Sequence, residues 1–141
     1  MEKIKLFLVD DDALFLKAME IDFLQLEGYE VETYATGELC IENISRNPDI
    51  IVLDYHLNGI TRNAMNGIDT LIKIKAYSAD IPVIMLSSQD KIEVAVNCMH
   101  HKAHDYVVKS ETQFIRLQQL IPAIIEHKKL EKKLSWYMAR M

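Results

Sequence analysis

The sequence has few cysteines and no long apolar run. Its 141 residues include only two cysteines, Cys40 and Cys98, which lie in helix-like segments without the spacing of metal ligands. This favours reduced thiols in a cytoplasmic protein. No apolar stretch approaches the roughly 18 residues that a membrane-spanning helix needs, and the run Leu6–Val9 is too short for a signal peptide. We therefore expect a cytoplasmic protein without membrane contact.

Excess positive charge is also missing from most of the chain. Residues 1–109 carry 10 Lys and Arg against 18 Asp and Glu, whereas residues 110–141 carry 6 against 3. An acidic body argues against nucleic-acid binding by this domain. The basic side chains near the C-terminus are expected to form a solvated helix face, with contact to an anionic partner as the alternative, and they are Lys128, Lys129, Lys132 and Lys133.

What the sequence does contain is a regular alternation of apolar runs and helical patterns. Strands are predicted at residues 4–9, 29–34, 50–53, 82–86 and 105–108. Helices are predicted at residues 13–27, 36–46, 67–76, 91–101 and 112–141. Continuous apolar strands that alternate with helices imply a parallel sheet covered by helices on both faces. The predicted fold class is α/β, with a doubly wound five-stranded sheet.

Several residues mark the expected helix ends. Asp12 and Asp90 are suitable N-caps for the first and fourth helices, and Gly28 is a natural stop for the first. Within residues 13–27 one apolar stripe is expected to pack inward, and its members are Phe15, Ala18, Met19, Phe23 and Leu26.

Polar residues follow four of the predicted strands. Right-handed crossovers bring the C-terminal ends of parallel strands to one edge of the sheet, where such sheets bind ligands. The polar residues expected at this edge are Asp10, Asp11, Asp54, Ser87 and Lys109. Carboxylates can hold a divalent cation, and one of them can attack phosphorus while a hydroxyl and a lysine hold the phosphoryl oxygens. The pattern therefore predicts a phosphoryl-transfer site.

Each of these residues also has a simpler interpretation. The acids at 10–12 can cap a helix and favour its dipole, and Asp54 can be a turn residue. Ser87 can cap a helix as well, and Lys109 can be a surface lysine. Three successive acids are more than one cap requires, so the site interpretation is preferred.

Four segments, by their order and spacing, carry a resemblance to a known family. They are Leu8–Asp12, Pro48–Asp54, Pro82–Ser88 and Asp105–Lys109. Over residues 3 to 127 the chain resembles the receiver domains of two-component response regulators, which include the chemotaxis regulator. The resemblance implies the sheet order 2-1-3-4-5 and phosphorylation by a histidine kinase or a phosphotransfer protein. It leaves the output partner open.

The resemblance also implies roles in phosphoryl transfer. Asp54 would accept the phosphoryl group, and Ser87 and Lys109 would bind it. Ser87 and Tyr106 would form the switch, although Tyr106 could simply pack at a strand end. The protein would then not be an enzyme, beyond promoting its own phosphorylation and dephosphorylation.

The metal site is likewise implied by the resemblance. Asp11 and Asp54 would ligate Mg²⁺ directly, together with the backbone carbonyl of His56. Asp10 would act largely through water. A second metal site made by His100, His101 and His104 is not expected, because an exposed, incidental cluster explains these residues better.

The chain departs from the family pattern in four places. Asn58 and Ser110 each replace a usual proline, and Lys102 replaces a usual glycine. About five extra residues lengthen the loop at 59–65. None of these changes removes a catalytic group. Because a cis peptide before serine costs about 2.5–4 kcal/mol, we expect a trans bond at 109–110 with a locally shifted Lys109.

Three other functions remain as alternatives. A metal-dependent phosphohydrolase with an aspartyl-phosphate intermediate would need a second acid where His56 stands. A flavodoxin-like carrier would need a glycine-rich phosphate loop where the chain has three aspartates. A degenerate receiver that only binds partners is ranked last, because all site residues are present.

The last helix is expected to extend beyond the receiver domain. We assign residues 1–127 to the domain and 128–141 to a helical extension, which contains no glycine or proline. Apolar residues at 4-3-4 spacing begin a seam, and they are Leu130, Leu134, Tyr137 and Met141. A weak homodimer through this seam is expected, with folding back or fraying as the alternative. The chain is either a stand-alone receiver or a piece of a longer protein.

Overall fold

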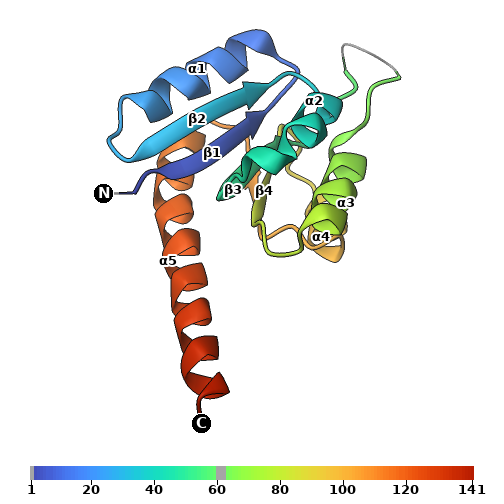
Figure 1. Cartoon of the computed structure of the whole chain (residues 1–141). Coiled ribbons are helices and arrows are strands. Elements are labelled where there is room, and N and C mark those ends of the chain that lie inside the picture. Colours follow the sequence, from blue (N-terminus) through green and yellow to red (C-terminus); the bar gives the residue numbers. More distant parts are fainter. Residues whose placement is uncertain (1, 60–62) are drawn as a thin grey trace.

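The computed structural model describes residues 2–59 and 63–141. Five parallel strands form one sheet, namely β1 (Ile4–Val9), β2 (Tyr29–Tyr34), β3 (Ile50–Asp54), β4 (Val83–Ser87) and β5 (Asp105–Val108). Five α-helices accompany it, namely α1 (Ala13–Leu24), α2 (Gly37–Glu42), α3 (Gly67–Tyr77), α4 (Ile92–His100) and α5 (Gln113–Ala139). The strand order is β2-β1-β3-β4-β5, and Figure 1 labels β2, β1, β3 and β4. The predicted fold class and strand order are therefore confirmed.

The sheet is covered on both faces because its central strands are apolar at successive positions. Side chains alternate between the two faces of a strand, so Leu6 and Leu8 enter one core while Phe7 and Val9 enter the other. Helices α1 and α5 pack on the first core, and helices α2, α3 and α4 pack on the second. Both β3 and β4 are buried along their whole length.

Helix α1 is shorter than predicted, but the predicted apolar stripe faces the core except at Ala18. Met19 and Phe23 are buried, and Phe15 and Leu26 pack against the first core. The helix ends at Leu24 rather than residue 27, and Gly28 lies beyond it in the turn before β2 with a φ of 96°. The residues buried in α1 are Leu16, Met19 and Phe23. Ala18, predicted to face inward, is exposed. The sequence was ambiguous here because apolar residues surround much of this helix.

Two other helix predictions need correction. The segment predicted as one helix at 36–46 divides into α2 and a short 3-10 helix, Ile44–Arg46 (η1). Asn47 then turns the chain with a φ of 62°. Asp90 is not the cap of α4, because Lys91 occupies that position without a side-chain hydrogen bond. Strand β4 begins and ends one residue later than predicted, at Val83 and Ser87, so Ser87 belongs to the strand.

The turn after α4 explains how the chain tolerates Lys102. This residue has a φ of 73°, in the left-handed region that glycine adopts more easily. Its amide donates to the Met99 carbonyl at 3.0 Å, and the Ala103 amide donates to Cys98 at 3.1 Å. The hydrogen bonds that close a helix end are therefore present, and they offset a conformational cost of roughly 1–2 kcal/mol.

The extended loop is anchored to α2. The amide of Met65 donates to a carboxylate oxygen of Glu38 at 2.9 Å. The predicted insertion at 59–65 includes residues 60–62, which lie outside the described residues.

Helix α5 leaves the sheet and projects beyond it (Figure 1). It continues through Pro122, and its buried residues are Leu117, Ile121 and Ile124. Every residue from 129 onward is exposed. Within the described ranges no helix has the length and apolar character to cross a membrane.

Candidate functional site

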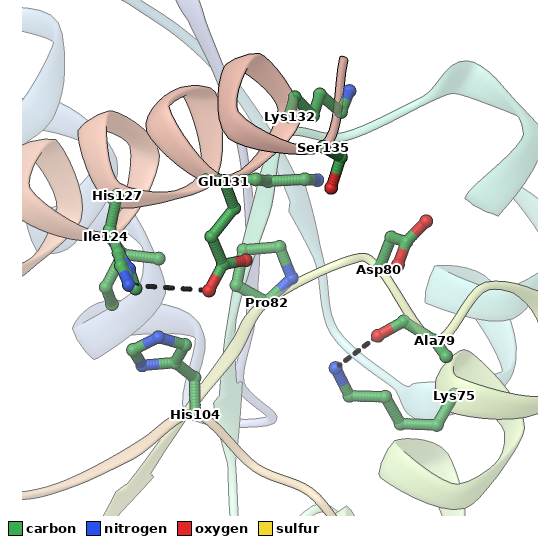
Figure 2. A pocket seen from close by; sticks show the side chains of 11 residues that line it. Lys75, Ala79, Asp80, Pro82, His104, Ile124, His127, Glu131, Lys132 and Ser135 are labelled. Carbon is green, nitrogen blue, oxygen red and sulfur yellow. Dashed lines mark hydrogen bonds and ion pairs between the residues drawn. The ribbon is translucent and has the colours of Figure 1, made fainter. Parts of the chain in front are cut away.

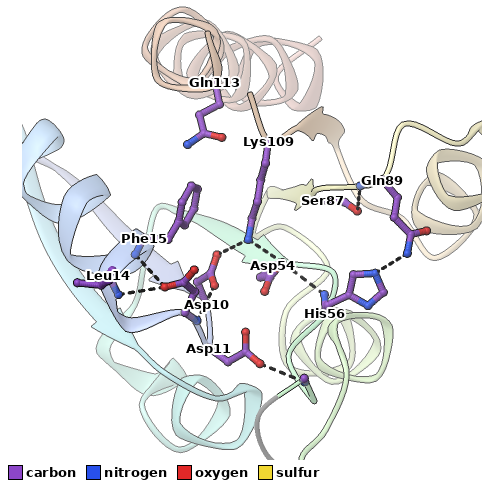
Figure 3. A network of polar contacts seen from close by, with 12 residues as sticks. Asp10, Asp11, Leu14, Phe15, Asp54, His56, Ser87, Gln89, Lys109 and Gln113 are labelled. Atoms are coloured by element: carbon purple, nitrogen blue, oxygen red, sulfur yellow. Dashed lines mark hydrogen bonds and ion pairs between the residues drawn. The ribbon is translucent and has the colours of Figure 1, made fainter. Parts of the chain in front are cut away.

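Three carboxylates meet at the C-terminal edge of the sheet. Strands β1 and β3 are neighbours with Val9 opposite Leu53, so the residues that end them, Asp10 and Asp54, lie side by side. Asp11 joins them, and one ligand oxygen of each acid lies within 4.8 Å of the others (Figure 3). Asp10 and Asp54 are each only 3% exposed. The edge predicted from the sequence is therefore a preformed acidic pocket.

The three successive aspartates have different partners. Asp12 caps α1, since its carboxylate accepts from the Leu14 and Phe15 amides at 3.1 and 3.2 Å. Asp10 accepts from the Asp12 amide at 2.9 Å, and Asp11 accepts from the Gly59 amide at 3.1 Å. Capping thus explains only Asp12, while Asp10 and Asp11 supply the pocket.

The protonation of Asp54 reflects its surroundings. Burial, and then the negative charge of Asp10, raise the pKa of Asp54 to about 7. The Lys109 ammonium and the His56 amide, which donates to Asp54 at 3.4 Å, act in the opposite direction. Two buried carboxylates this close repel each other, so a bound cation would stabilise the pocket.

Lys109 reaches the pocket from the end of β5. Its ammonium lies 2.9 Å from a carboxylate oxygen of Asp10 and 3.4 Å from one of Asp54. Burial by itself would lower the pKa of Lys109, but the hydrogen bond to Asp10 and the charge of Asp54 outweigh it and raise the pKa. The ammonium also lies 4.4 Å from the ring centroid of Phe15. Phe15 packs against the first core as predicted, and its contact with the Lys109 ammonium is an addition that the sequence did not predict.

The backbone around Lys109 is regular despite Ser110. The 109–110 peptide is trans, as expected. The Lys109 amide donates to the Ser87 carbonyl at 2.7 Å, which continues the pairing of β4 with β5. The lysine is therefore positioned by the sheet without the usual proline.

Gln89 connects the residues expected to form the switch, although the sequence did not single it out. Its amide donates to the buried Ser87 hydroxyl at 3.1 Å, and its carbonyl accepts from the Tyr106 hydroxyl. Its side-chain amide lies 2.8 Å from Nε2 of His56 (Figure 3). No local sequence signal identifies such a residue, because its partners come from three different segments.

Gly67 allows α3 to begin directly behind the pocket. A Cβ at this position would lie 2.5 Å from the Asp54 carbonyl oxygen and 2.6 Å from that of Tyr55. Such contacts are too short for a real side chain, so a glycine is required here. Asn66 caps the helix by accepting from the Asp69 amide at 2.8 Å.

The donors at the acidic pocket suit Mg²⁺, which prefers carboxylate and carbonyl oxygens. Within the described part of the chain, no other group of three His, Cys, Asp or Glu residues is close enough to hold a metal. His104 instead pairs with Asp105 at 3.0 Å, and the rings of His100 and His101 contact each other.

Residues 6–122 match the response regulator receiver domain. The chain belongs to this family. Regulatory protein LuxO of Vibrio cholerae is 31% identical over 100 residues, which cover 70% of this chain and 21% of that protein. This chain thus spans about a fifth of the length of that relative. Receiver domains are phosphorylation-controlled switches of two-component signalling, and the phosphohydrolase, flavodoxin-like and degenerate alternatives are not favoured.

Solved structures agree with this assignment. The signal receiver domain of a LuxO-type repressor from Vibrio parahaemolyticus has a TM-score of 0.80 at 25% identity, covering 94% of this chain and 97% of that one. A CheX–CheY–BeF3–Mg²⁺ complex from Borrelia burgdorferi has a TM-score of 0.73 at 26% identity, covering 86% and 90%. Receiver domains bind Mg²⁺ through acidic residues, and this chain has such an acidic cluster.

Proposed function

We propose that this receiver domain accepts a phosphoryl group on Asp54 from a histidine kinase or a phosphotransfer protein. The observation that carries the proposal is the convergence of three carboxylates and one lysine at a single sheet edge. Asp54 is the acid at the end of the buried central strand β3. The changed surface would then be read by an output partner.

Asp54 and the residues around it would have different roles in the reaction. A carboxylate oxygen of Asp54 would attack phosphorus, and the bond from phosphorus to the donor would break with its electron pair leaving on the donor. Lys109 and the Ser87 hydroxyl would hold the phosphoryl oxygens. Because Lys109 contacts Asp10 and Asp54 in this structure, it would exchange carboxylate contacts for phosphoryl contacts. The same groups would support self-dephosphorylation.

Mg²⁺ would be held by Asp11, Asp54 and the backbone carbonyl of His56, with Asp10 acting largely through water. When bound, it supplies positive charge that offsets the repulsion between the acids and the phosphoryl oxygens. The support for this assignment is the close approach of the three carboxylates.

Phosphorylation is expected to require the metal. With acetyl phosphate and Mg²⁺, intact-protein mass spectrometry should show one added phosphoryl group, and an excess of chelator should reduce labelling to background. Restoring Mg²⁺ after the chelator serves as the control. Equal labelling with and without the metal would contradict the proposed site.

Ser87 and Tyr106 are proposed to carry the signal away from the pocket. Ser87 would move to the phosphoryl group and release the Gln89 amide, and Tyr106 would turn inward as its contact with Gln89 changes. We expect a beryllofluoride mimic to alter amide hydrogen exchange in residues 87–110 and on the face made by α4, β5 and α5. Unchanged exchange in this range would count against the switch.

The extension at 128–141 is proposed to form a weak homodimer. The seam residues are between 56% and 101% exposed, and they are Leu130, Leu134, Tyr137 and Met141. So short a seam gives a weak contact. We expect sedimentation to detect a dimer of the full chain that Leu130→Glu with Leu134→Glu abolishes. Leu14→Glu, on the exposed side of α1, is the matched control. Identical monomers of the full chain and the double variant would refute the dimer.

We also propose a cytoplasmic location and a domain boundary at residue 127. The location follows from the proposed phosphoryl donor, because the domain must be in the same compartment as its histidine kinase or phosphotransfer protein. Cys40 and Cys98 are both free and buried, which suits a reducing compartment. The boundary is supported by the end of buried positions in α5 at Ile124. No nucleic-acid contact is proposed for this acidic domain.

A further inference from the structure

A second cavity lies at the opposite edge of the sheet from the acidic pocket. It has a volume of about 510 Å³ and is bordered by the end of α3, by Pro82 and His104 before β4 and β5, and by the projecting part of α5. Figure 2 shows the side chains that line it, with Lys75 from α3 on one side and Glu131, Lys132 and Ser135 from α5 on the other. We call this cavity the base cleft. Its size suits a small-molecule ligand.

The α5 wall of the base cleft continues the face with which this helix packs on the sheet. Leu117, Ile121 and Ile124 are buried on that face. The next positions on it, at the same helical spacing, are Lys128, Glu131 and Ser135, and all three line the cleft. The face therefore changes from apolar to polar where the helix leaves the sheet. Such a wall suits a polar ligand better than further packing.

The run of four lysines divides into two pairs in the folded chain. Lys128 and Lys132, one helical turn apart, line the base cleft, whereas Lys129 and Lys133 do not. Lys128 is partly buried, and the other three lysines are exposed. Lys75 lines the cleft from α3. Among the described residues, no carboxylate oxygen lies within 4.0 Å of the ammonium groups of Lys75, Lys128 or Lys132.

The cleft carries three lysines and two acids, Asp80 and Glu131, and none of the lysines forms an ion pair within 4.0 Å among the described residues. The half-buried Lys75 donates to the carbonyls of Ala79 and Ile81 at 3.2 and 2.6 Å, which leaves one of its three N–H groups. Burial, and then the charge of Lys128, lower the pKa of Lys75, and Asp80 opposes them. The other acid of the cleft, Glu131, lies 3.4 Å from His127. An oxyanion between the lysines would relieve their repulsion.

We propose that the base cleft binds a small phosphate-bearing anion through Lys75, Lys128 and Lys132. The ligand accepts from the free N–H of Lys75 on the domain and from both lysines of α5. A phosphate group has enough oxygens and charge for three ammonium groups. Bound there, it ties the projecting helix to the end of α3. The site is independent of phosphoryl transfer to Asp54.

Because only two of the four lysines line the base cleft, the other two provide a matched control. Diphosphate is titrated into the full chain without Mg²⁺ at constant ionic strength, with backbone amide shifts and calorimetry as readouts. We expect shifts at residues 75–82 and 128–135. The change Lys128→Gln with Lys132→Gln should weaken binding at least about tenfold, since two charge-assisted contacts are lost. The change Lys129→Gln with Lys133→Gln alters the net charge equally and should change affinity less than about twofold.

The remaining measurements compare possible ligands and separate binding at the base cleft from binding at the acidic pocket. Inorganic phosphate and adenosine monophosphate are compared with diphosphate, and acetate at equal ionic strength tests for general anion binding. Asp54→Asn should bind diphosphate as the natural chain does, so failure of phosphoryl transfer leaves this result unaffected. Equal weakening by both lysine pairs, equal binding of acetate, or shifts confined to the region of Asp10 and Lys109 would overturn the proposal.

Discussion

The Asp54→Asn variant is expected to take up no phosphoryl group from acetyl phosphate, even with Mg²⁺. Asparagine has nearly the same shape as aspartate, so it fits the end of β3, but its amide lacks the anionic oxygen that attacks phosphorus. Asp54 is only 3% exposed, so the effect of the substitution is confined to the buried end of β3. Intact-protein mass spectrometry should therefore show labelling at background, against one phosphoryl group for the natural chain.

Asp12→Asn is the matched control for this experiment. Asparagine caps helices as well as aspartate does, and the Asp12 carboxylate accepts from the α1 amides and is not one of the three acids that converge at the pocket. We expect this variant to be labelled like the natural chain. Labelling that survives in Asp54→Asn would show that another carboxylate accepts the phosphoryl group. Loss of labelling in Asp12→Asn would contradict the division of roles among the three aspartates.

The stability of the metal-free chain is expected to fall as the pH rises from about 4 to about 7. Burial and the charge of Asp10 raise the pKa of Asp54 from 3.8 to about 7 in the folded chain. Between these values the folded state holds a proton that the unfolded state has lost, so the free energy of unfolding decreases with pH. Above pH 7 the decrease in the free energy of unfolding is complete. At 1.36 kcal/mol per pH unit, the loss has an upper limit of roughly 4 kcal/mol.

Asp54→Asn should remove this contribution because asparagine does not titrate. Urea unfolding at several pH values between 4 and 8, with chelator, should show the variant gaining on the natural chain as the pH rises. Adding Mg²⁺ at pH 8 should stabilise the natural chain more than the variant, since a bound cation favours the ionised carboxylates. Parallel curves for the two proteins across this range would show that Asp54 ionises without cost in the folded state.

Gln89 connects three residues of the site through direct contacts. It touches Ser87 and Tyr106 through its backbone and His56 through its side chain. The backbone contacts survive substitution of the side chain, whereas the His56 contact does not. Ser87 and Tyr106, the proposed switch residues, are thus both hydrogen-bonded to Gln89, so the proposed shift of Ser87 would reach Tyr106 through this residue.

The sequence by itself determined the strands and the order of the site residues along the chain. Four of the five strands are short apolar runs followed or ended by a polar residue, which is a local signal that later folding does not alter. Parallel strands must end at one edge, so Asp10, Asp54 and Lys109 converge there as predicted. Ser87 ends β4 at the same edge, with its buried hydroxyl bonded to the Gln89 amide. The capping role of Asp12 could also be predicted, because it depends only on the next three residues.

Tertiary structure alone decided which of several equivalent faces or side chains was used. Helix α1 is apolar on most sides, so only packing selected Leu16 for the core and directed Phe15 to Lys109. The four lysines of α5 are alike in sequence, and only the position of the sheet beside this helix separates Lys128 from Lys129. Such choices depend on contacts between segments far apart in the chain, and residue type and spacing do not encode them locally.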